Sequence, residues 1–294
     1  MGDEIFRNIE KMHSVEIIKP KVSVIIPCFN DEKYLFKTIN SLLSQSFTDW
    51  ECILINDGST DGTEGIIQQA KKLDNRLKYI YQKNAGVCVA RNNAIKASIG
   101  EYILCLDAND LISKNFLDET VKVLDSDPAL AVATSKIQFF GKSNSILKVV
   151  SYDIDILLAE NQLVITSLFR RSDFDRIGGF NTNMKEGYED WDFWISLLKD
   201  GGLVKCADQA TFYYRLLNQS RNSLTTLERE RRLRYQMWEN HKELYSRYFI
   251  DPTSYSEYKR HANSHEYRVG KIILTPIRKT IWFITLIKEK LNIR

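Results

Sequence analysis

The chain has 294 residues, 44% of them hydrophobic, and its 41 basic and 38 acidic side chains leave a formal net charge of +3. This length and composition are sufficient for a sizeable core, in one large domain or in one domain with an appendage. The near-neutral balance provides no general attraction for nucleic acid, so we expect no nucleic-acid partner.

The cysteines, the N-terminus and the apolar segments indicate in which cellular compartment the protein lies. The five cysteines are odd in number and contain no CxxC pair, and Cys28, Cys52 and Cys105 lie in or beside apolar runs. Such residues are typical of small core side chains in a reducing compartment. The N-terminus lacks the apolar stretch of a secretory signal, and no segment reaches the length of a transmembrane helix. We therefore expect a cytoplasmic protein.

The first half of the chain alternates between strand and helix patterns. The first 20 residues show no clear period and are expected to form an N-terminal arm. Apolar runs predict strands at 22–27, 50–55, 77–81 and 102–106, and helical spacing predicts the helices between them. Asn30 or Asp31 is expected to cap the first helix, and Asp61 the second, with Glu64 as its capping-box partner. This alternation is typical of a mostly parallel sheet flanked by helices.

The second half is less regular. We expect helices at 114–124 and 190–199, one or two strands within 131–140, and a strand at 163–169. Two late strands, 203–206 and 211–216, are expected at a sheet edge, followed by a helical pattern over 224–249. The sequence thus predicts an α/β domain with a mixed, mostly parallel sheet at 21–223. A helical C-terminal extension follows at 224–294.

Polar side chains follow each predicted parallel strand. Ligands of open α/β sheets bind at the carboxyl ends of the strands, so these side chains should line one crevice. Their carboxylates and amides suit a ribose, a base N–H or a hard cation, and Arg91 can face a diphosphate. An ion pair between Arg91 and one of the aspartates is an alternative that is compatible with this role. No GxGxxG or P-loop motif follows the first strand, which argues against a nicotinamide or P-loop site. The residues concerned are Asn30, Asp31, Asn56, Asp57, Asn84 and Asp107–Asp110.

One acidic residue is predicted to face inward in the first turn of a helix. In a helix starting near Glu189, Asp190 shares a stripe with Phe193 and Trp194. A carboxylate there either complements the helix dipole, a role open to Glu189 and Asp192 as well, or serves as a general base. In the second case the helix N-terminus would keep the Asp190 carboxylate ionised, and the carboxylate would face an acceptor hydroxyl. The residues alone leave both explanations open.

Six segments together resemble family 2 glycosyltransferases and follow the order seen in that family. The resemblance covers roughly residues 20–223 and implies a GT-A fold. It also implies an inverting transfer of a sugar from a nucleoside diphosphate, usually UDP, to a hydroxyl. The segments are Val22–Asn30, Asn56–Asp61, Asn84–Asn92, Leu106–Asp110, Ile177–Phe180 and Glu189–Asp192.

The resemblance also implies a role for individual positions. Asp57 matches the residue that holds the uracil, Asp107 to Asn109 stands at the metal-binding DxD motif, and Asp190 matches the catalytic base. Glu189, Trp191 and Arg215 fall on the acceptor or leaving-group side. The remaining positions expected to bind the donor nucleotide are Pro27, Asn30, Glu32, Asn84, Arg91 and Asp107.

Two departures from the family pattern concern the metal. Asn109 replaces the aspartate expected to bind the cation directly, and Leu217 replaces a histidine often found near the diphosphate. An amide still offers an oxygen, but the site has lost one negative charge. We therefore expect Mg²⁺ or Mn²⁺ to bind more weakly than at a DxD site. Arg91, Arg215 or Arg221 would then share the charge of the leaving group.

The tail at 271–294 has the composition of an interfacial helix. Ile281, Trp282 and Ile284 lie between clusters of basic residues, which predicts a peripheral position at the inner face of the membrane. The alternative is a helix packed against the catalytic domain or a second subunit, and a homo-oligomer is compatible with the sequence.

Three functional hypotheses follow. The first is a membrane-associated glycosyltransferase that uses a UDP-sugar and a glycan or lipid-linked acceptor in surface polysaccharide assembly. The second is a non-catalytic nucleotide-sugar-binding or scaffold protein of the same fold. The third, a nucleotidyltransferase, would normally carry a glycine-rich basic loop after its first strand, and no such loop is found here.

Overall fold

The computed structural model of the chain describes residues 19–142, 144–147, 152–217, 226–248 and 264. Most of the expected N-terminal arm, the tail at 271–294 and Arg221 lie outside these residues. No helix within the described ranges is long and apolar enough to cross a membrane.

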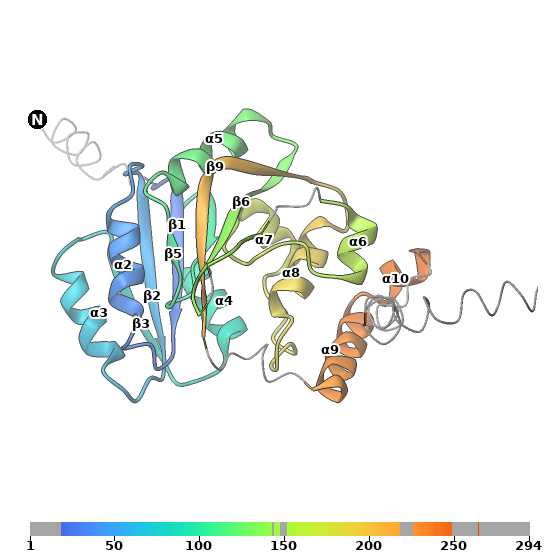
Figure 1. Cartoon of the computed structure of the whole chain (residues 1–294), viewed down its shortest axis with the longest axis horizontal. Coiled ribbons are helices and arrows are strands. Elements are labelled where there is room, and N and C mark those ends of the chain that lie inside the picture. Colours follow the sequence, from blue (N-terminus) through green and yellow to red (C-terminus); the bar gives the residue numbers. More distant parts are fainter. Residues whose placement is uncertain (1–18, 143, 148–151, 218–225, 249–263, 265–294) are drawn as a thin grey trace, which may run out of the picture.

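The described strands form one sheet (Figure 1). Its order is β3-β2-β1-β4-β8-β6-β9-β5, with β7 paired to β6. Strands β1 to β4 pair in parallel, as do β6 and β9, whereas β8 runs antiparallel to both β4 and β6. This confirms the mixed, mostly parallel sheet. The strands are β1 Val22–Cys28, β2 Trp50–Asp57, β3 Leu77–Gln82, β4 Tyr102–Cys105, β5 Leu111–Ile112, β6 Leu130–Gly141, β7 Ile146–Leu147, β8 Leu168–Arg170 and β9 Leu203–Leu216.

Helices cover both faces of this sheet, which explains the unbroken apolar runs of its central strands. Alternate residues of β2 enter two separate cores, with Cys52 and Leu54 in one and Ile53 and Ile55 in the other. The first core is closed by α2, α3 and α5, and the second by α4, α7 and α8. The helices are α2 Leu35–Leu43, α3 Thr63–Lys71, α4 Val87–Ala97, α5 Phe116–Ser126, α6 Ile154–Ala159, α7 Arg171–Ile177, α8 Glu189–Leu198, α9 Leu227–Asn240 and α10 Lys242–Tyr248.

Neither predicted N-cap residue occupies the N-cap position itself, although the Asp61 carboxylate accepts from the backbone N–H of Thr63, the first residue of α3, at 3.0 Å. Helix α2 begins one turn later than expected, after Tyr34, and the carboxylate of Asp31 accepts from the backbone N–H of Phe29 instead. Gly62 occupies the N-cap of α3, and Glu64 accepts from the hydroxyl of Tyr79 rather than closing a capping box. The Asp31 side chain thus satisfies a loop contact, and Glu64 joins α3 to β3.

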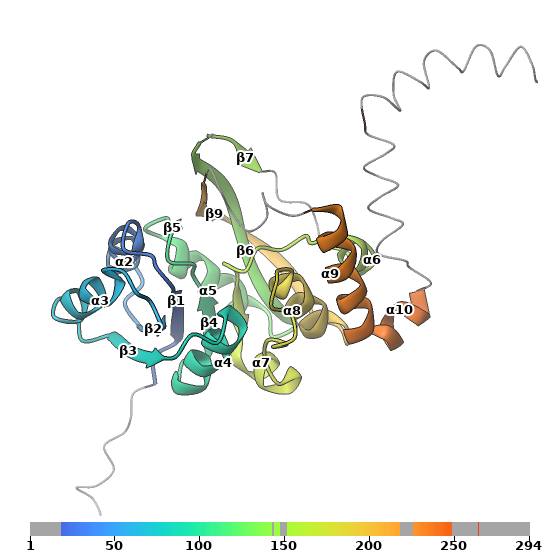
Figure 2. The same cartoon turned by 90° about the horizontal axis from the view of Figure 1, so that it is seen from below.

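The second half differs more from its prediction. Of the expected strand at 163–169 only the last two residues are in a strand, β8, which ends at Arg170, and α7 follows it at once. The two late strands form a single strand, β9, which bulges opposite Ser135 and Lys136. This strand lies between β6 and β5, so the predicted edge position is wrong. The C-terminal helical pattern divides at His241 into α9 and α10, which pack beside α6 and α8 (Figure 2).

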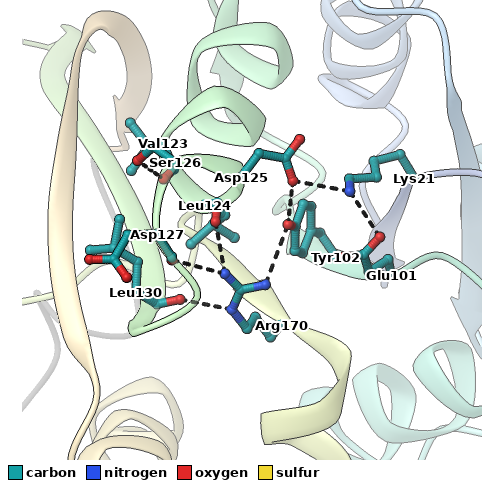
Figure 3. A network of polar contacts seen from close by, with 10 residues as sticks. All are labelled: Lys21, Glu101, Tyr102, Val123, Leu124, Asp125, Ser126, Asp127, Leu130 and Arg170. Atoms are coloured by element: carbon teal, nitrogen blue, oxygen red, sulfur yellow. Dashed lines mark hydrogen bonds and ion pairs between the residues drawn. The ribbon is translucent and has the colours of Figure 1, made fainter.

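A polar network closes the end of the sheet where β1 and β4 begin (Figure 3). Arg170 donates from Nε to the carbonyl of Leu130 and from Nη2 to that of Leu124, each at 2.8 Å. The Tyr102 hydroxyl donates to Asp125 at 2.6 Å, and Lys21 pairs with Asp125 at 3.0 Å. These bonds fasten α5 and β6 to the central strands, at the end opposite the polar strand ends singled out by sequence.

A close backbone approach at this end generates a stability prediction. A Cβ at Gly100 would lie 2.5 Å from both the backbone nitrogen and the Oγ of Ser23 in β1. We expect Gly100→Ala to lower the free energy of unfolding by about 1–3 kcal/mol, because β1 and Gly100 cannot separate without strain. Urea denaturation would measure it.

Gly65 provides the matched control. It lies in α3 with no atom within 4 Å of its would-be Cβ. Gly65→Ala should instead stabilise the fold by roughly 0.5–1 kcal/mol through its higher helix propensity. Equal effects of the two substitutions would contradict the packing argument.

Candidate active site

The loops after β1 and β2 form one wall of the site and are bonded to each other. Asn30 has a positive φ of 57°, and its Oδ1 accepts from the backbone N–H of Thr60 at 2.8 Å. Glu32 accepts from the backbone N–H of Gly62 at 2.7 Å. Pro27, at the end of β1, pairs with Ile55 of β2. Two residues assigned to nucleotide binding, Asn30 and Glu32, therefore lie on one pair of interlocked loops, and Pro27 lies in the strand that leads into them.

Asp57, at the end of β2, organises the next loop. Its Oδ1 accepts from the backbone N–H of Ala85 at 2.8 Å, and its Oδ2 from that of Gly86 at 3.0 Å. Asn84 is exposed and donates to the Asp57 carbonyl at 3.0 Å. The structure thus brings Asp57 and Asn84 together, at the start of the helix that carries Arg91. In the unliganded chain, both oxygens of Asp57 accept from this loop.

Arg91 lies at the centre of the site. It is only 1% exposed, and its Nη2 donates to Oδ1 of Asp107 at 2.8 Å. Its Nη1 lies 3.6 Å from Oε1 of Glu189. Burial lowers the pKa of the guanidinium, but the charges of Asp107 and Glu189 outweigh burial and raise it. A buried cation thus joins α4, the end of β4 and α8, and the predicted ion pair between Arg91 and an aspartate is present.

Asp190 lies beside this group in the first turn of α8. Its Oδ1 accepts from the backbone N–H of Trp191 at 2.8 Å, and its Oδ2 accepts from Nδ2 of Asn161 at 3.1 Å. Burial, followed by the negative charge of Glu189, raises its pKa to about 7, while Arg91 and the Trp191 N–H act in the opposite direction. Desolvation and Glu189 thus oppose the effect expected from the helix N-terminus, which favours the ionised form.

The other residues expected near the acceptor have different surroundings. Glu189 is buried beside Arg91. Trp191 is also buried, and its indole N–H donates to the carbonyl of Leu157 in α6 at 2.6 Å. Its side chain packs against α6, so the contact it offers to the site is indirect. Tyr188, which precedes α8, holds a left-handed backbone conformation with φ of 58°, a strained arrangement that often marks functional sites.

The loop after β4 is fastened to β9. Nε of Arg215 donates to the carbonyl of Asn109, and its backbone N–H donates to Oδ1 of Asp110, both at 2.7 Å. Asp110 is 3% exposed, and burial together with the charge of Asp107 raises its pKa to about 8. This carboxyl therefore holds the loop to β9 and is not exposed to solvent. Arg215 is brought against the Asp107–Asn109 segment, as the sequence interpretation required.

Aromatic rings fix the Arg215 guanidinium. Its centre lies 4.5 Å from the Tyr34 ring and 4.3 Å from the Phe140 ring, and Nη2 is buried without a hydrogen-bond partner. Cation–π contacts of this kind hold a charge in place without neutralising it. The site therefore contains two positioned guanidinium groups, those of Arg91 and Arg215.

The side chains do not fit a divalent cation site built by the protein. Within the described ranges, no group of three or more histidine, cysteine or acidic side chains is arranged to hold a metal ion. Asp107 is already bound to Arg91, whose positive charge opposes a cation, and Asn109 contributes only a neutral amide. Leu217 offers no ligand at all. The strength of metal binding therefore stays a prediction.

The sequence interpretation missed one polar contact of the site. Asn161, which bonds the carboxylate of Asp190, lies in a loop that carries no motif or periodicity. It also missed the buried pair behind α8, in which Nε2 of His241 lies 3.0 Å from Oδ1 of Asp192. Each pair joins residues 29 or 49 positions apart, and only the fold brings them together.

Comparison with known proteins identifies the class. Residues 23–191 match the family model described as Glycosyl transferase family 2. The chain is 31% identical over 209 residues to the putative teichuronic acid biosynthesis glycosyltransferase TuaG of Bacillus subtilis, which covers 70% of this chain and 82% of that protein. The protein is thus an enzyme of the glycosyltransferase class. It belongs to glycosyltransferase family 2, as the six sequence segments indicated.

Two solved structures confirm the fold. TarS of S. aureus, determined in complex with UDP-GlcNAc, superposes with a TM-score of 0.63 at 21% identity, covering 75% of this chain and 66% of that one. The mannosyltransferase PcManGT of Pyrobaculum calidifontis, determined with GDP-Man and Mn²⁺, gives 0.57 at 16% identity, covering 94% and 86%. At these identities the likeness concerns the fold alone. The sheet and its flanking helices have the GT-A arrangement.

Proposed function

We propose that this enzyme transfers a sugar from a UDP-sugar to a hydroxyl of a glycan or lipid-linked acceptor, with inversion, in surface polysaccharide assembly. The observation that supports this most directly is the carboxyl of Asp190, whose pKa of about 7 suits a general base, next to the Arg91–Asp107 pair. The relative named for teichuronic acid biosynthesis supports a polysaccharide product, and the TarS complex with UDP-GlcNAc supports a UDP donor.

The proposed reaction is a single displacement. Asp190 accepts the proton of the acceptor hydroxyl. At the same time the hydroxyl oxygen attacks the anomeric carbon from the face opposite the diphosphate. The new carbon–oxygen bond forms as the bond to the β-phosphate oxygen breaks, and UDP departs with that electron pair. One displacement inverts the anomeric configuration. A base with a pKa close to the working pH combines a large ionised fraction with strong proton affinity.

The donor would lie across the loops at the carboxyl ends of β1 to β4. Asp57 and Asn84 are proposed to contact the base, and Pro27, Asn30, Glu32 and Asp107 the rest of the nucleotide. Charge on the departing diphosphate is assigned mainly to Arg215, whose Nη2 lacks a hydrogen-bond partner, while Arg91, paired with Asp107 and Glu189, offsets the repulsion between these carboxylates and the diphosphate. No step of this scheme requires a protein-held cation.

Substitution of the base tests the catalytic role. We expect Asp190→Asn to lower kcat about 10²–10⁴-fold, because the amide cannot accept the proton, while UDP affinity stays within twofold. UDP release on a panel of UDP-sugars with an oligosaccharide acceptor, together with calorimetry of UDP binding, would measure both. Retained transfer by this variant would refute the assignment. Binding of UDP without turnover by the wild type would instead favour the scaffold alternative.

The raised pKa of Asp190 predicts a pH dependence. The base acts only when deprotonated, so kcat/KM should increase as the pH rises through about 7 and level off above it. Below that value it should fall tenfold per pH unit, as expected for one essential deprotonated group. A pH–rate profile from 5.5 to 9 would measure this. A profile that is flat down to pH 5.5 would contradict it.

Asn109 tests the metal site. We expect Asn109→Asp to bind Mn²⁺ more tightly, roughly 10-fold or more, because a second carboxylate joins Asp107 near the diphosphate. Mn²⁺ titration in the presence of UDP would measure it, with Asn115→Asp, a partly exposed site at the start of α5, as the control for added charge. Equal Mn²⁺ affinities for the wild type and Asn109→Asp would contradict the inference that Asn109 weakens metal binding.

We also propose that residues 271–294 hold the enzyme at an anionic membrane surface, close to a lipid-linked acceptor. The support is their composition alone, since they lie outside the described residues. Deletion of these residues should reduce binding to vesicles that contain anionic lipid, measured by sedimentation. Unchanged binding would remove this part of the proposal.

A further inference from the structure

Helix α6 ends in three backbone carbonyls that are capped by side chains from elsewhere in the chain. The last carbonyls of a helix have no partner within it and need donors from outside. The indole N–H of Trp191 donates to Leu157 at 2.6 Å, and the hydroxyl of Tyr245 donates to Leu158 at 2.8 Å. Nη1 of Arg234 donates to Ala159 at 3.1 Å. The end of α6 is thus held by α8, α10 and α9 in turn.

These donors are themselves fixed. Tyr245 and Arg234 are buried, and the Arg234 guanidinium lies over the Trp191 ring at 4.8 Å. Behind them, Asp192 of α8 is fully buried and meets Nε2 of His241 at 3.0 Å and Nδ2 of Asn240 at 2.7 Å. Figure 2 shows α6, α8, α9 and α10 gathered at one end of the molecule. The loop that leaves α6 therefore starts from an immobilised point.

Asn161 stands two residues beyond that point. Its side chain is exposed, and its Nδ2 donates to Oδ2 of Asp190 at 3.1 Å, while its Oδ1 accepts from the backbone N–H of Leu163 at 3.2 Å. The second bond fixes which end of the amide faces the carboxylate. Because Oδ1 of Asp190 accepts from the Trp191 N–H, each oxygen has one donor and one remaining acceptor position.

We propose that Asn161 is a positioning residue for the general base, which holds Oδ2 of Asp190 toward the acceptor hydroxyl. Helices α9 and α10 support this role because they cap α6 and so set the position of the loop that carries Asn161. The assignment rests on the proposed function of Asp190. It involves α9 and α10, which lie beyond residue 191, where the family match ends.

The contact should also be visible in the titration of Asp190. The charged groups around that carboxyl are Glu189 from α8, Arg91 from α4 and Asp107 from the end of β4, and Asn161 adds a neutral donor from the α6 side. A hydrogen bond donated to a carboxylate stabilises its ionised form. Loss of the donor therefore raises the pKa of Asp190, whereas a general loosening of the loop has no such specific effect.

The experiment compares Asn161→Ala, Asn161→Asp and wild type by pH–rate profiles and by ¹³C NMR titration of the aspartate carboxyls, with the Asp190 signal assigned through Asp190→Asn. We expect Asn161→Ala to move the acidic limb and the Asp190 titration upward by roughly one pH unit. Turnover should then be about tenfold lower at pH 6 and recover above pH 8.5. Asn161→Asp, which cannot donate and adds a charge, should move both further.

Gln162→Ala is the matched control, because this neighbour in the same loop accepts from the backbone N–H of Asp153. It should leave the Asp190 titration in place. An unshifted Asp190 signal in Asn161→Ala, or an equal loss of activity at every pH, would overturn the proposal. The NMR readout needs no turnover. A wild type without transferase activity would therefore refute the proposed function. The NMR titration would still show whether Asn161 bonds the Asp190 carboxylate.

Discussion

The arrangement of this site depends on one buried cation. Arg91 is almost inaccessible to solvent, so its charge must be balanced by Asp107 and Glu189. These partners come from the end of β4 and the start of α8, two elements that are not neighbours in the sheet or the chain. The requirement for charge balance therefore fixes the carboxylate-bearing ends of both halves of the domain relative to each other.

That arrangement also sets the chemistry of Asp190. The surroundings that compel Arg91 to pair also desolvate Asp190 in part and place Glu189 beside it, so the pKa rises to about 7 although a cation is close. A carboxylate exposed at the same helix position would be a much weaker base. The electrostatic environment, rather than the identity of the residue, makes the group suitable for accepting a proton near neutral pH.

The sequence predicted those features that depend on local pattern. The strands β1, β2 and β4 are buried on both faces, so their apolar runs were unambiguous, and Asp57, Arg91, Asp107 and Asp190 lie in recognisable segments. Helix caps and the continuity of β9 depend instead on tertiary partners, as the contact between Glu64 and Tyr79 shows. Asn161 had no local signal, because its role arises only from a hydrogen bond between distant loops.

The boundary drawn at residue 223 separates segments that the structure joins. Asp192 follows Asp190 by two residues on α8 but faces away from it, and its Oδ1 is bonded by Asn240 and His241. A buried carboxylate at that position is tolerable only while these partners are present. Helix α8 therefore carries one acidic residue bonded to Asn161 and a second bonded to the C-terminal helices. Because both residues lie on one helix, α9 and α10 pack as part of the same structural unit as the segment that carries Asp190.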